Sequence, residues 1–189
     1  MLFSITQHAQ ELRRCPMTAE TALMQDLETG RFVLRQTEAS HFELLYQAAS
    51  DPAVWAQHPE SNRWQRPVFT AFFEGGLRND LGCFTIFDRS RQAVIGSTRF
   101  YGYDAAESAV RLGYTFLAAE YWGTGANREI KDVLLTQAFQ VVTKVFFDIG
   151  VNNIRSRKAT EKLGAVEHQH LDDKMVYLLA KNKYLLVRE

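Results

Sequence analysis

The feature that most constrains the fold is a strand, a glycine loop, a helix and a second strand in direct succession between residues 108 and 151. Residues 108–117 alternate apolar side chains with polar or small ones, as a half-buried strand does. Residues 130–142 carry apolar side chains at helical spacing, and "VFFDIGV", 145–151, has the length and apolar character of a buried strand. Because one helix separates the two strands, they can pair in parallel through a crossover connection. The chain is therefore expected to mix helix and sheet.

The sequence on either side of this unit predicts antiparallel strands. Strands are expected at Phe32–Gln36, Cys83–Asp88 and Ala93–Tyr101, and the last two lead into residues 108–117 as a three-stranded meander. "ALMQDL" and "RFVLRQ" flank Gly30, which suggests a hairpin or a strand entry. "AVEHQH" and "KMVYLLA", near the end of the chain, are expected to form a closing hairpin.

Helix signals lie between these strands. Ser40 and Glu43 have the spacing of a capping box at the start of one helix. A second helix is expected to begin at Pro67, since proline suits the first helical position. A short third helix has Asn153 as its predicted N-cap and Gly164 just past its end, where left-handed geometry favours glycine.

The length indicates one domain with a short extension. A chain of 189 residues with 46% hydrophobic side chains can bury a sizeable core. We interpret residues 1–20 as an N-terminal extension and residues 21–189 as a single domain. Ile5, Ala9 and Leu12 in the extension have the spacing of a short amphipathic helix.

Composition argues against several classes of partner. Lys plus Arg (22) equals Asp plus Glu (22), whereas a general nucleic-acid or membrane-surface binder usually has a basic excess. No run of 18 apolar residues and no signal-peptide pattern occurs, so the chain is predicted to be cytoplasmic. Cys15 and Cys83, without histidines at ligand spacing, indicate neither a disulfide framework nor a metal site.

The glycine loop "EYWGTGANREI", residues 120–130, admits several interpretations. A Walker loop is excluded, since no Gly-Lys pair follows Gly123 at the required spacing. A dinucleotide fingerprint fits poorly, because Arg128 stands where a third glycine or alanine belongs. A nest of backbone N–H groups at a helix N-terminus would hold an anion, and Gly123 and Gly125 would let the backbone approach it closely. A plain strand-to-helix turn fits the same residues equally well.

Two motifs in this order carry a family resemblance. "LGYTFLAAEYWGTGAN" before a long helix, and "VNNIRSRKATEKLGA" after the next strand, resemble the GNAT superfamily of acyl-CoA N-acyltransferases, in particular its Rim-like branch, which acetylates ribosomal-protein N-termini and related amines. The resemblance runs from Leu27 to Ala180. It implies an α+β (mixed α/β) GNAT fold, in which a mostly antiparallel central sheet with a splayed parallel strand pair is flanked by helices.

The resemblance also implies where coenzyme A binds. In the family the loop holds the pyrophosphate, and a bulge in the preceding strand, here near Thr115 to Leu117, frees backbone N–H groups for the pantetheine and the thioester oxygen. Asn153 and Ser156 match an Asn-x-x-Ser motif beside the pantetheine, although Asn153 could be only a helix cap. Trp122 and Asn127 depart from the family's loop pattern, and Arg128 is either a phosphate partner or a solvated charge. The implied cofactor-binding residues are Phe116, Leu117, Trp122, Gly123, Thr124, Gly125, Ala126, Asn127, Arg128, Asn153 and Ser156.

The catalytic groups are less evident. The tyrosine with which many GNAT enzymes protonate the departing thiolate is replaced by Thr160, so Ser156 is the candidate donor. Rim-like relatives often carry an acidic residue just before the Gly-Tyr of this strand, but Leu112 stands there. His58 and Glu60 are therefore the candidate bases, since the resemblance implies that their segment lines the acceptor side; a water chain or the free amine fraction would make a base unnecessary. Aromatic residues that could line an acceptor pocket are Trp55, Trp64, Tyr101, Tyr103 and Tyr114.

These residues support three hypotheses. The first is an N-acetyltransferase that moves an acetyl group from acetyl-CoA to a primary amine, either a protein N-terminus or a small amine, by direct attack in a ternary complex without a metal. The second is a catalytically weak or inactive CoA-binding protein that acts through regulation or a partner. The third is an unrelated nucleotide-binding α/β protein. A homodimer stays open, whereas nucleic-acid and membrane partners are not expected.

Overall fold

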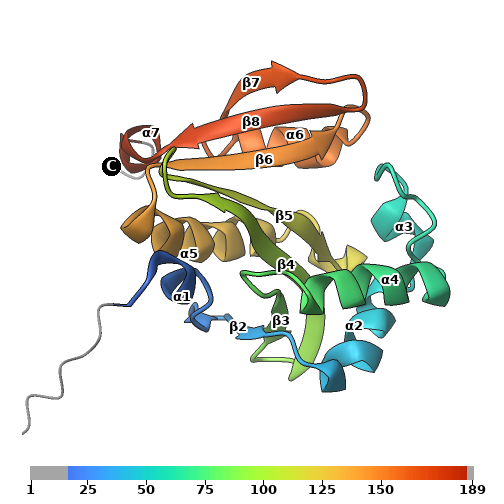
Figure 1. Ribbon diagram of the computed structural model, residues 1–189. Helices are drawn as coiled ribbons and strands as arrows, with labels where there is room; N and C mark the ends of the chain where they lie inside the picture. The colour runs from blue at the N-terminus through green and yellow to red at the C-terminus, as the bar shows by residue number, and fades with distance from the viewer. Residues whose placement is uncertain (1–16, 187–189) are drawn as a thin grey trace, which may run out of the picture.

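The computed structural model describes residues 17–186, which form one mixed sheet with helices on both faces (Figure 1). Eight strands follow the spatial order β1-β2-β3-β4-β5-β6-β8-β7, and every neighbouring pair is antiparallel except β5 and β6. The strands are β1 (Leu27–Glu28), β2 (Phe32–Gln36), β3 (Phe84–Asp88), β4 (Ala93–Asp104), β5 (Ala109–Leu117), β6 (Lys144–Gly150), β7 (Val166–His170) and β8 (Lys174–Ala180). The predicted α+β class, parallel pair, meander and closing hairpin are confirmed.

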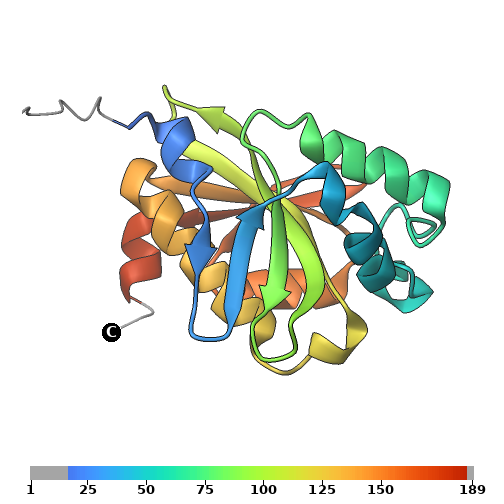
Figure 2. The same cartoon turned by 90° about the horizontal axis from the view of Figure 1, so that it is seen from below.

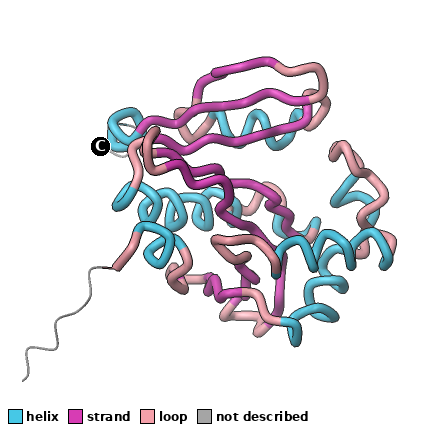
Figure 3. The backbone as a smooth tube through the Cα atoms, in the orientation of Figure 1, coloured by secondary structure: helices cyan, strands magenta, loops and turns pink. Residues whose placement is uncertain are grey.

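The parallel pair is short, and this opens the sheet. β5 and β6 pair only from Ala109↔Lys144 to Arg111↔Phe146, at the beginning of both strands. Beyond these residues the two strands diverge, as Figures 1 and 3 show. Past the divergence each strand has one edge without a ladder partner, so backbone donors and acceptors there are free to bind something else.

Helices cover the two faces unequally. Seen from below in Figure 2, α1 and α5 lie together, away from the group formed by α2, α3 and α4. The helices are α1 (Ala19–Leu23), α2 (Phe42–Ala49), α3 (Pro52–Trp55), α4 (Arg66–Leu77), α5 (Ala126–Val141), α6 (Ile154–Glu161) and α7 (Lys181–Leu186), with short 3-10 turns η1 (Ala39–His41) and η2 (Ala119–Tyr121).

Each face has its own apolar core. The larger cluster joins α5 to the strands, with Phe32, Phe100, Ile130 and Leu134 fully buried within it. The smaller cluster is mainly aromatic and packs α2, α3 and α4 against Phe116 of β5. Consequently β5 is held from both faces up to the point where it leaves β6, which fixes the width of the gap between the two strands.

A bulge in β5 lies slightly before the predicted position. Ser97 pairs with Phe116 and Arg99 pairs with Gly113, so two β5 residues, Tyr114 and Thr115, stand opposite a single β4 residue. Tyr114 has a φ of 52° and is 45% exposed. The alternation expected over residues 108–117 therefore breaks at Tyr114, because the bulge turns this side chain out of the core.

Two predictions near the N-terminus meet different outcomes. The capping box expected from Ser40 and Glu43 is wrong: the box forms between Glu38 and His41 and opens the η1 turn, so α2 begins only at Phe42. The Glu38–His41 pair therefore forms the cap in place of the Ser40–Glu43 pair, which was predicted from its spacing alone. The amphipathic helix predicted around Ile5 lies outside the described residues.

Candidate functional site

A cleft of about 630 Å³ occupies the gap between β5 and β6 and continues to the start of α5. Its volume is in the range of small-molecule sites. The walls come from α3 and the residue His58 beyond it, the second half of β5, the end of β6, the glycine loop with the first turns of α5, and α6. The predicted cofactor residues that line it are Phe116, Leu117, Trp122, Gly123, Gly125, Asn127, Arg128, Asn153 and Ser156.

The glycine loop forms one end of the cleft. Gly123 and Gly125 have φ values of 73° and 86°, in the left-handed region that favours glycine. A Cβ at either position would meet no atom within 4 Å, so backbone conformation rather than crowding requires glycine. Gly125 is the N-cap of α5, and the first N–H groups of a helix have no acceptor within it. The loop therefore presents unpaired donors and the positive end of a helix dipole beside open space.

Two other predicted loop residues shape the turn instead of lining the cleft. The Thr124 hydroxyl donates to the Tyr121 carbonyl at 2.8 Å and accepts from the Ala126 N–H at 3.4 Å. Ala126 itself is buried in the larger core. A role for Thr124 and Ala126 in ligand binding would therefore rest on their backbone groups.

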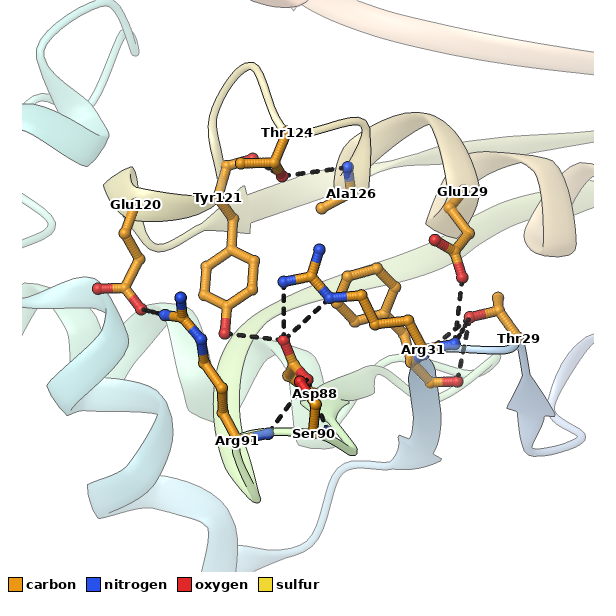
Figure 4. A network of polar contacts seen from close by, with 11 residues as sticks. Thr29, Arg31, Asp88, Ser90, Arg91, Glu120, Tyr121, Thr124, Ala126 and Glu129 are labelled. Atoms are coloured by element: carbon orange, nitrogen blue, oxygen red, sulfur yellow. Dashed lines mark hydrogen bonds and ion pairs between the residues drawn. The ribbon is translucent and has the colours of Figure 1, made fainter.

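A buried carboxylate anchors the loop from behind (Figure 4). Asp88, at the end of β3, is fully buried and accepts hydrogen bonds from Ser90, Arg31 and the Tyr121 hydroxyl, the last at 3.1 Å. Burial by itself raises the pKa of Asp88, but the hydrogen bonds outweigh it and hold that pKa well below its usual range. Since Tyr121 ends the η2 turn just before Gly123, the sheet fixes the position of the loop.

Arg128 is more tightly held than the sequence suggested. Its guanidinium donates to the Asp132 carboxylate at 3.1 Å and to the Lys162 carbonyl at 2.8 Å, which ties α5 to the end of α6. Basic side chains nonetheless dominate this cleft, in which Asp148 is the single acidic residue of the lining. The basic residues are Arg128, Lys131, Arg155, Lys158 and Lys162. Although the whole chain is neutral, the cleft itself suits an anionic ligand.

The start of α6 brings Asn153 and Ser156 to the opposite wall. The Asn153 side chain accepts a hydrogen bond from the Ser156 N–H at 3.1 Å, so Asn153 is the N-cap, as predicted. The Ser156 hydroxyl makes no hydrogen bond within residues 17–186. Ser156 is therefore free to bind a ligand, whereas the Asn153 oxygen already serves the helix.

The two candidate bases are differently placed. His58 lines the cleft, but Glu60 does not: its carboxylate pairs with Arg63 at 2.6 Å. Burial, followed by the charge of Arg63, lowers the pKa of His58 to about 4. The imidazole is thus neutral at pH 7, with the Glu60 N–H 3.0 Å from one ring nitrogen and Arg63 3.0 Å from the other. A neutral imidazole has one acceptor nitrogen, and in either tautomer that nitrogen already faces a donor, which leaves no free acceptor for a substrate proton.

The aromatic acceptor wall is smaller than predicted. Trp55 and Tyr114 line the cleft. Tyr101 instead donates to the Asp148 carboxylate at 3.0 Å, and Tyr103 packs against the larger core. Trp64 lies outside the cleft lining and is 37% exposed.

Lys131 was not among the predicted site residues. It lines the cleft from α5, is only 6% exposed, and donates to the Thr115 hydroxyl at 2.7 Å. Burial lowers the pKa of Lys131 to about 7. The sequence held one signal for it, a charged residue next to Ile130 at the edge of the apolar stripe, but a lysine in such a place usually extends its charge into solvent.

Comparison with known proteins identifies the family. A model of the acetyltransferase (GNAT) domain matches residues 31–166. The chain belongs to the GNAT family. The family and its fold make the chain an acyltransferase of the N-acetyltransferase type, and GNAT acetyltransferases use acetyl-CoA. The sequence has no match among the curated proteins.

Solved structures share the GNAT fold. An acetyltransferase structure from T. thermophilus has 26% identity and a TM-score of 0.70, with 87% of this chain and 93% of that chain covered. Spermidine N-acetyltransferase from Vibrio cholerae, in complex with CoA and spermine, has 17% identity and a TM-score of 0.66, with 83% and 99% covered. A structure assigned as a ribosomal-protein-serine acetyltransferase, also from Vibrio cholerae, has 19% identity and a TM-score of 0.66, with 82% and 97% covered.

Two features are absent from the described part of the chain. Within residues 17–186, no group of three or more histidine, cysteine, aspartate or glutamate side chains could hold a metal ion. None of the helices in that range has the length and apolar content needed to cross a bilayer.

Proposed function

We propose that this GNAT protein transfers an acetyl group from acetyl-CoA to a primary amine, a protein N-terminus or a small amine, by direct attack in a ternary complex. The observation that carries the proposal is the continuity of one cleft, which runs from the unpaired N–H groups at the start of α5 to the β5 bulge. A ligand with an anionic end and a long thin arm fits a cleft of this shape. Acetyl-CoA has both.

In the proposed complex the pyrophosphate lies on residues 123–128 and the pantetheine arm fills the gap between β5 and β6. The Ala118 N–H donates to the Ile95 carbonyl of β4. Since successive residues of a strand point to opposite sides, the Leu117 N–H points into the gap, where β6 has diverged. Leu117 is thus the favoured donor for the thioester oxygen, while Phe116 contributes its ring to the wall. The basic lining offsets the phosphate charges.

Direct attack is supported by the cleft lining, which contains no cysteine among residues 17–186. Cys83 is buried outside the cleft lining, and burial raises the pKa of its thiol. A cysteine nucleophile needs the opposite environment, one that stabilises the thiolate. The amine would therefore attack the thioester carbon itself, from the side of Trp55 and Tyr114, with Ser156 close to the sulfur.

The test is release of CoA thiol from acetyl-CoA with a panel of acceptors: spermine, single amino acids, and peptides with different N-terminal residues. At least one acceptor should raise thiol release tenfold or more over the acceptor-free rate, with a matching mass increase of the acceptor. A rise in melting temperature with acetyl-CoA but no release for any acceptor would contradict catalysis. It would favour a CoA-binding regulatory protein, a role consistent with Thr160 in the usual tyrosine position. Stabilisation by ATP or NAD alone would overturn the CoA assignment.

A further inference from the structure

Lys131 is a buried cation with an unusual set of neighbours. It lines the cleft from α5, and its ammonium donates a hydrogen bond to the Thr115 hydroxyl at 2.7 Å. Within residues 17–186 it forms no ion pair. Its charge lies 5.8 Å from the centre of the Phe147 ring. A buried ammonium without a carboxylate is costly, so its presence in a ligand cleft points to a function.

The other charged groups along the cleft do not compensate this charge. On its own helix, Arg128 and Asp132 are bonded to each other. On β6, the Asp148 carboxylate is held by Arg111 and Tyr101. β5 contributes no charged side chain to the lining. The charged side chains that α6 and its C-cap contribute are all basic, Arg155, Lys158 and Lys162, and the segment after α3 contributes the neutral His58. Burial is accordingly the only cause that lowers the pKa of Lys131.

The position of Lys131 relates it to the reacting group. Thr115 belongs to the β5 bulge, two residues before the Leu117 N–H that would bind the thioester oxygen. The Thr115 hydroxyl also contacts the Thr98 hydroxyl at 2.7 Å, which fixes its place. An ammonium has three N–H donors, and Thr115 occupies one of them. The remaining two are available to a ligand in the gap.

We propose that Lys131 is the catalytic acid that protonates the departing CoA thiolate, an inference that rests on the proposed acetyl transfer. The amine nitrogen forms a bond to the thioester carbon, and the C–S bond breaks with its electron pair passing to sulfur. The Lys131 ammonium gives one proton to that sulfur, forming the CoA thiol. The attacking amine loses one proton, which returns to Lys131 through water in the cleft, so the enzyme ends unchanged.

Lys131 suits this task better than Ser156 does. An efficient acid has a pKa near the working pH, and a pKa of about 7 satisfies this whereas a serine hydroxyl does not. Ser156, on the opposite wall, then positions the sulfur by a hydrogen bond.

The experiment measures kcat and KM for acetyl-CoA from pH 5.5 to 9.5 in the full chain, in Lys131→Met and in Lys131→Arg. Methionine keeps the stem and removes the donor; arginine keeps the charge but does not give up a proton. We expect kcat to fall at least 100-fold in both variants, with KM changed less than about threefold, because acid catalysis contributes about 10²–10⁴-fold. The alkaline limb of the kcat profile should disappear in Lys131→Met. The control is Lys181→Met, an exposed lysine on α7.

Several outcomes separate this inference from the proposed function. A wild-type chain without acetyl transfer to any amine overturns both. An active wild type with Lys131→Met within threefold of it, or with Lys131→Arg restored to wild-type kcat, overturns the acid role alone. A loss of kcat with an unchanged pH profile also overturns it, since it indicates a structural role. If Lys131→Met does not fold, Lys131→Gln is judged by the same criteria.

Discussion

At the scale of single residues, the start of α6 divides two tasks between neighbours. The Asn153 side-chain oxygen accepts a hydrogen bond that caps the helix, whereas the Ser156 hydroxyl has no hydrogen-bond partner among residues 17–186 and lines the cleft. If the hydroxyl binds the CoA sulfur, Ser156→Ala should lower kcat about tenfold, the worth of one hydrogen bond, with little change in the Kd of acetyl-CoA. Steady-state rates and calorimetry measure the two quantities. Ser50→Ala, at an exposed serine beyond α2, is the control, and an unchanged kcat in Ser156→Ala removes the role.

Single residues also show where sequence reasoning reaches its limit. Gly125 and Asn153 were predictable, because a positive φ and a helix cap are requirements of the local backbone. Glu60 and Lys131 were not. Glu60 and Arg63 are only three residues apart, but their spacing alone does not say whether the carboxylate pairs with the guanidinium or faces a ligand. The burial of the Lys131 ammonium depends on segments far apart in the chain. Sequence therefore indicated the conformation of the glycine loop and the helix cap better than the surroundings of Glu60 and Lys131.

At the scale of elements, the junction of the glycine loop and α5 should decide CoA affinity. Gly125→Asp places a negative charge where the pyrophosphate would bind, and space is open for the side chain. We expect the Kd of CoA to rise more than 100-fold, since like charges in a confined site repel. Gly125→Asn, equal in shape but uncharged, carries the same backbone strain and should weaken binding much less. Equal affinities for the two variants would exclude charge, and an unchanged Kd in both would place the phosphates elsewhere.

The anchor behind the loop supplies a second prediction at this scale. Tyr121→Phe removes one hydrogen bond from the buried Asp88 carboxylate. The free energy of unfolding should fall by about 2 kcal/mol, because a bond to a buried charge is lost. The Kd of CoA should rise a few-fold as the loop loosens. Urea unfolding and calorimetry measure both. Tyr103→Phe removes a hydroxyl without a hydrogen bond in residues 17–186 and is the matched control; equal effects of the two changes would contradict the anchor.

Elements were more predictable than their exact registers. The order of strand, loop, helix and strand follows from periodicity, and it suffices to predict the parallel pair. The bulge at Tyr114 and Thr115 lies earlier than expected, and the capping box expected at Ser40 forms instead at Glu38, where it opens the η1 turn. Both depend on which of several nearby residues the tertiary structure selects, and one sequence gives no basis for that choice.

At the scale of the whole molecule, buried titratable groups set the dependence of stability on pH. Burial lowers the pKa of His58 from 6.5 to about 4 and that of Lys131 from 10.5 to about 7. Between each pair of values the unfolded chain binds more protons than the folded one, so stability rises with pH in both windows, by at most about 1.4 kcal/mol per pH unit for each proton. The pKa of Tyr101 is raised, chiefly by burial, so its contribution is present below pH 10 and is lost above it.

The melting temperature should therefore keep rising from pH 4 to about pH 9 instead of reaching its maximum near neutrality. It should level off there, because burial raises the pKa of the Cys83 thiol and its contribution opposes that of Lys131, and it should fall beyond pH 10. Scanning calorimetry across this range in buffers of equal ionic strength measures the profile. Lys131→Met should flatten the rise between pH 7 and 10 and increase stability at pH 7, since it removes the burial cost of an unpaired charge. His58→Gln should flatten only the acidic window. A wild-type maximum near pH 7, or identical profiles for wild type and Lys131→Met, would show that Lys131 keeps its charge and that the cleft is wetter than its burial indicates.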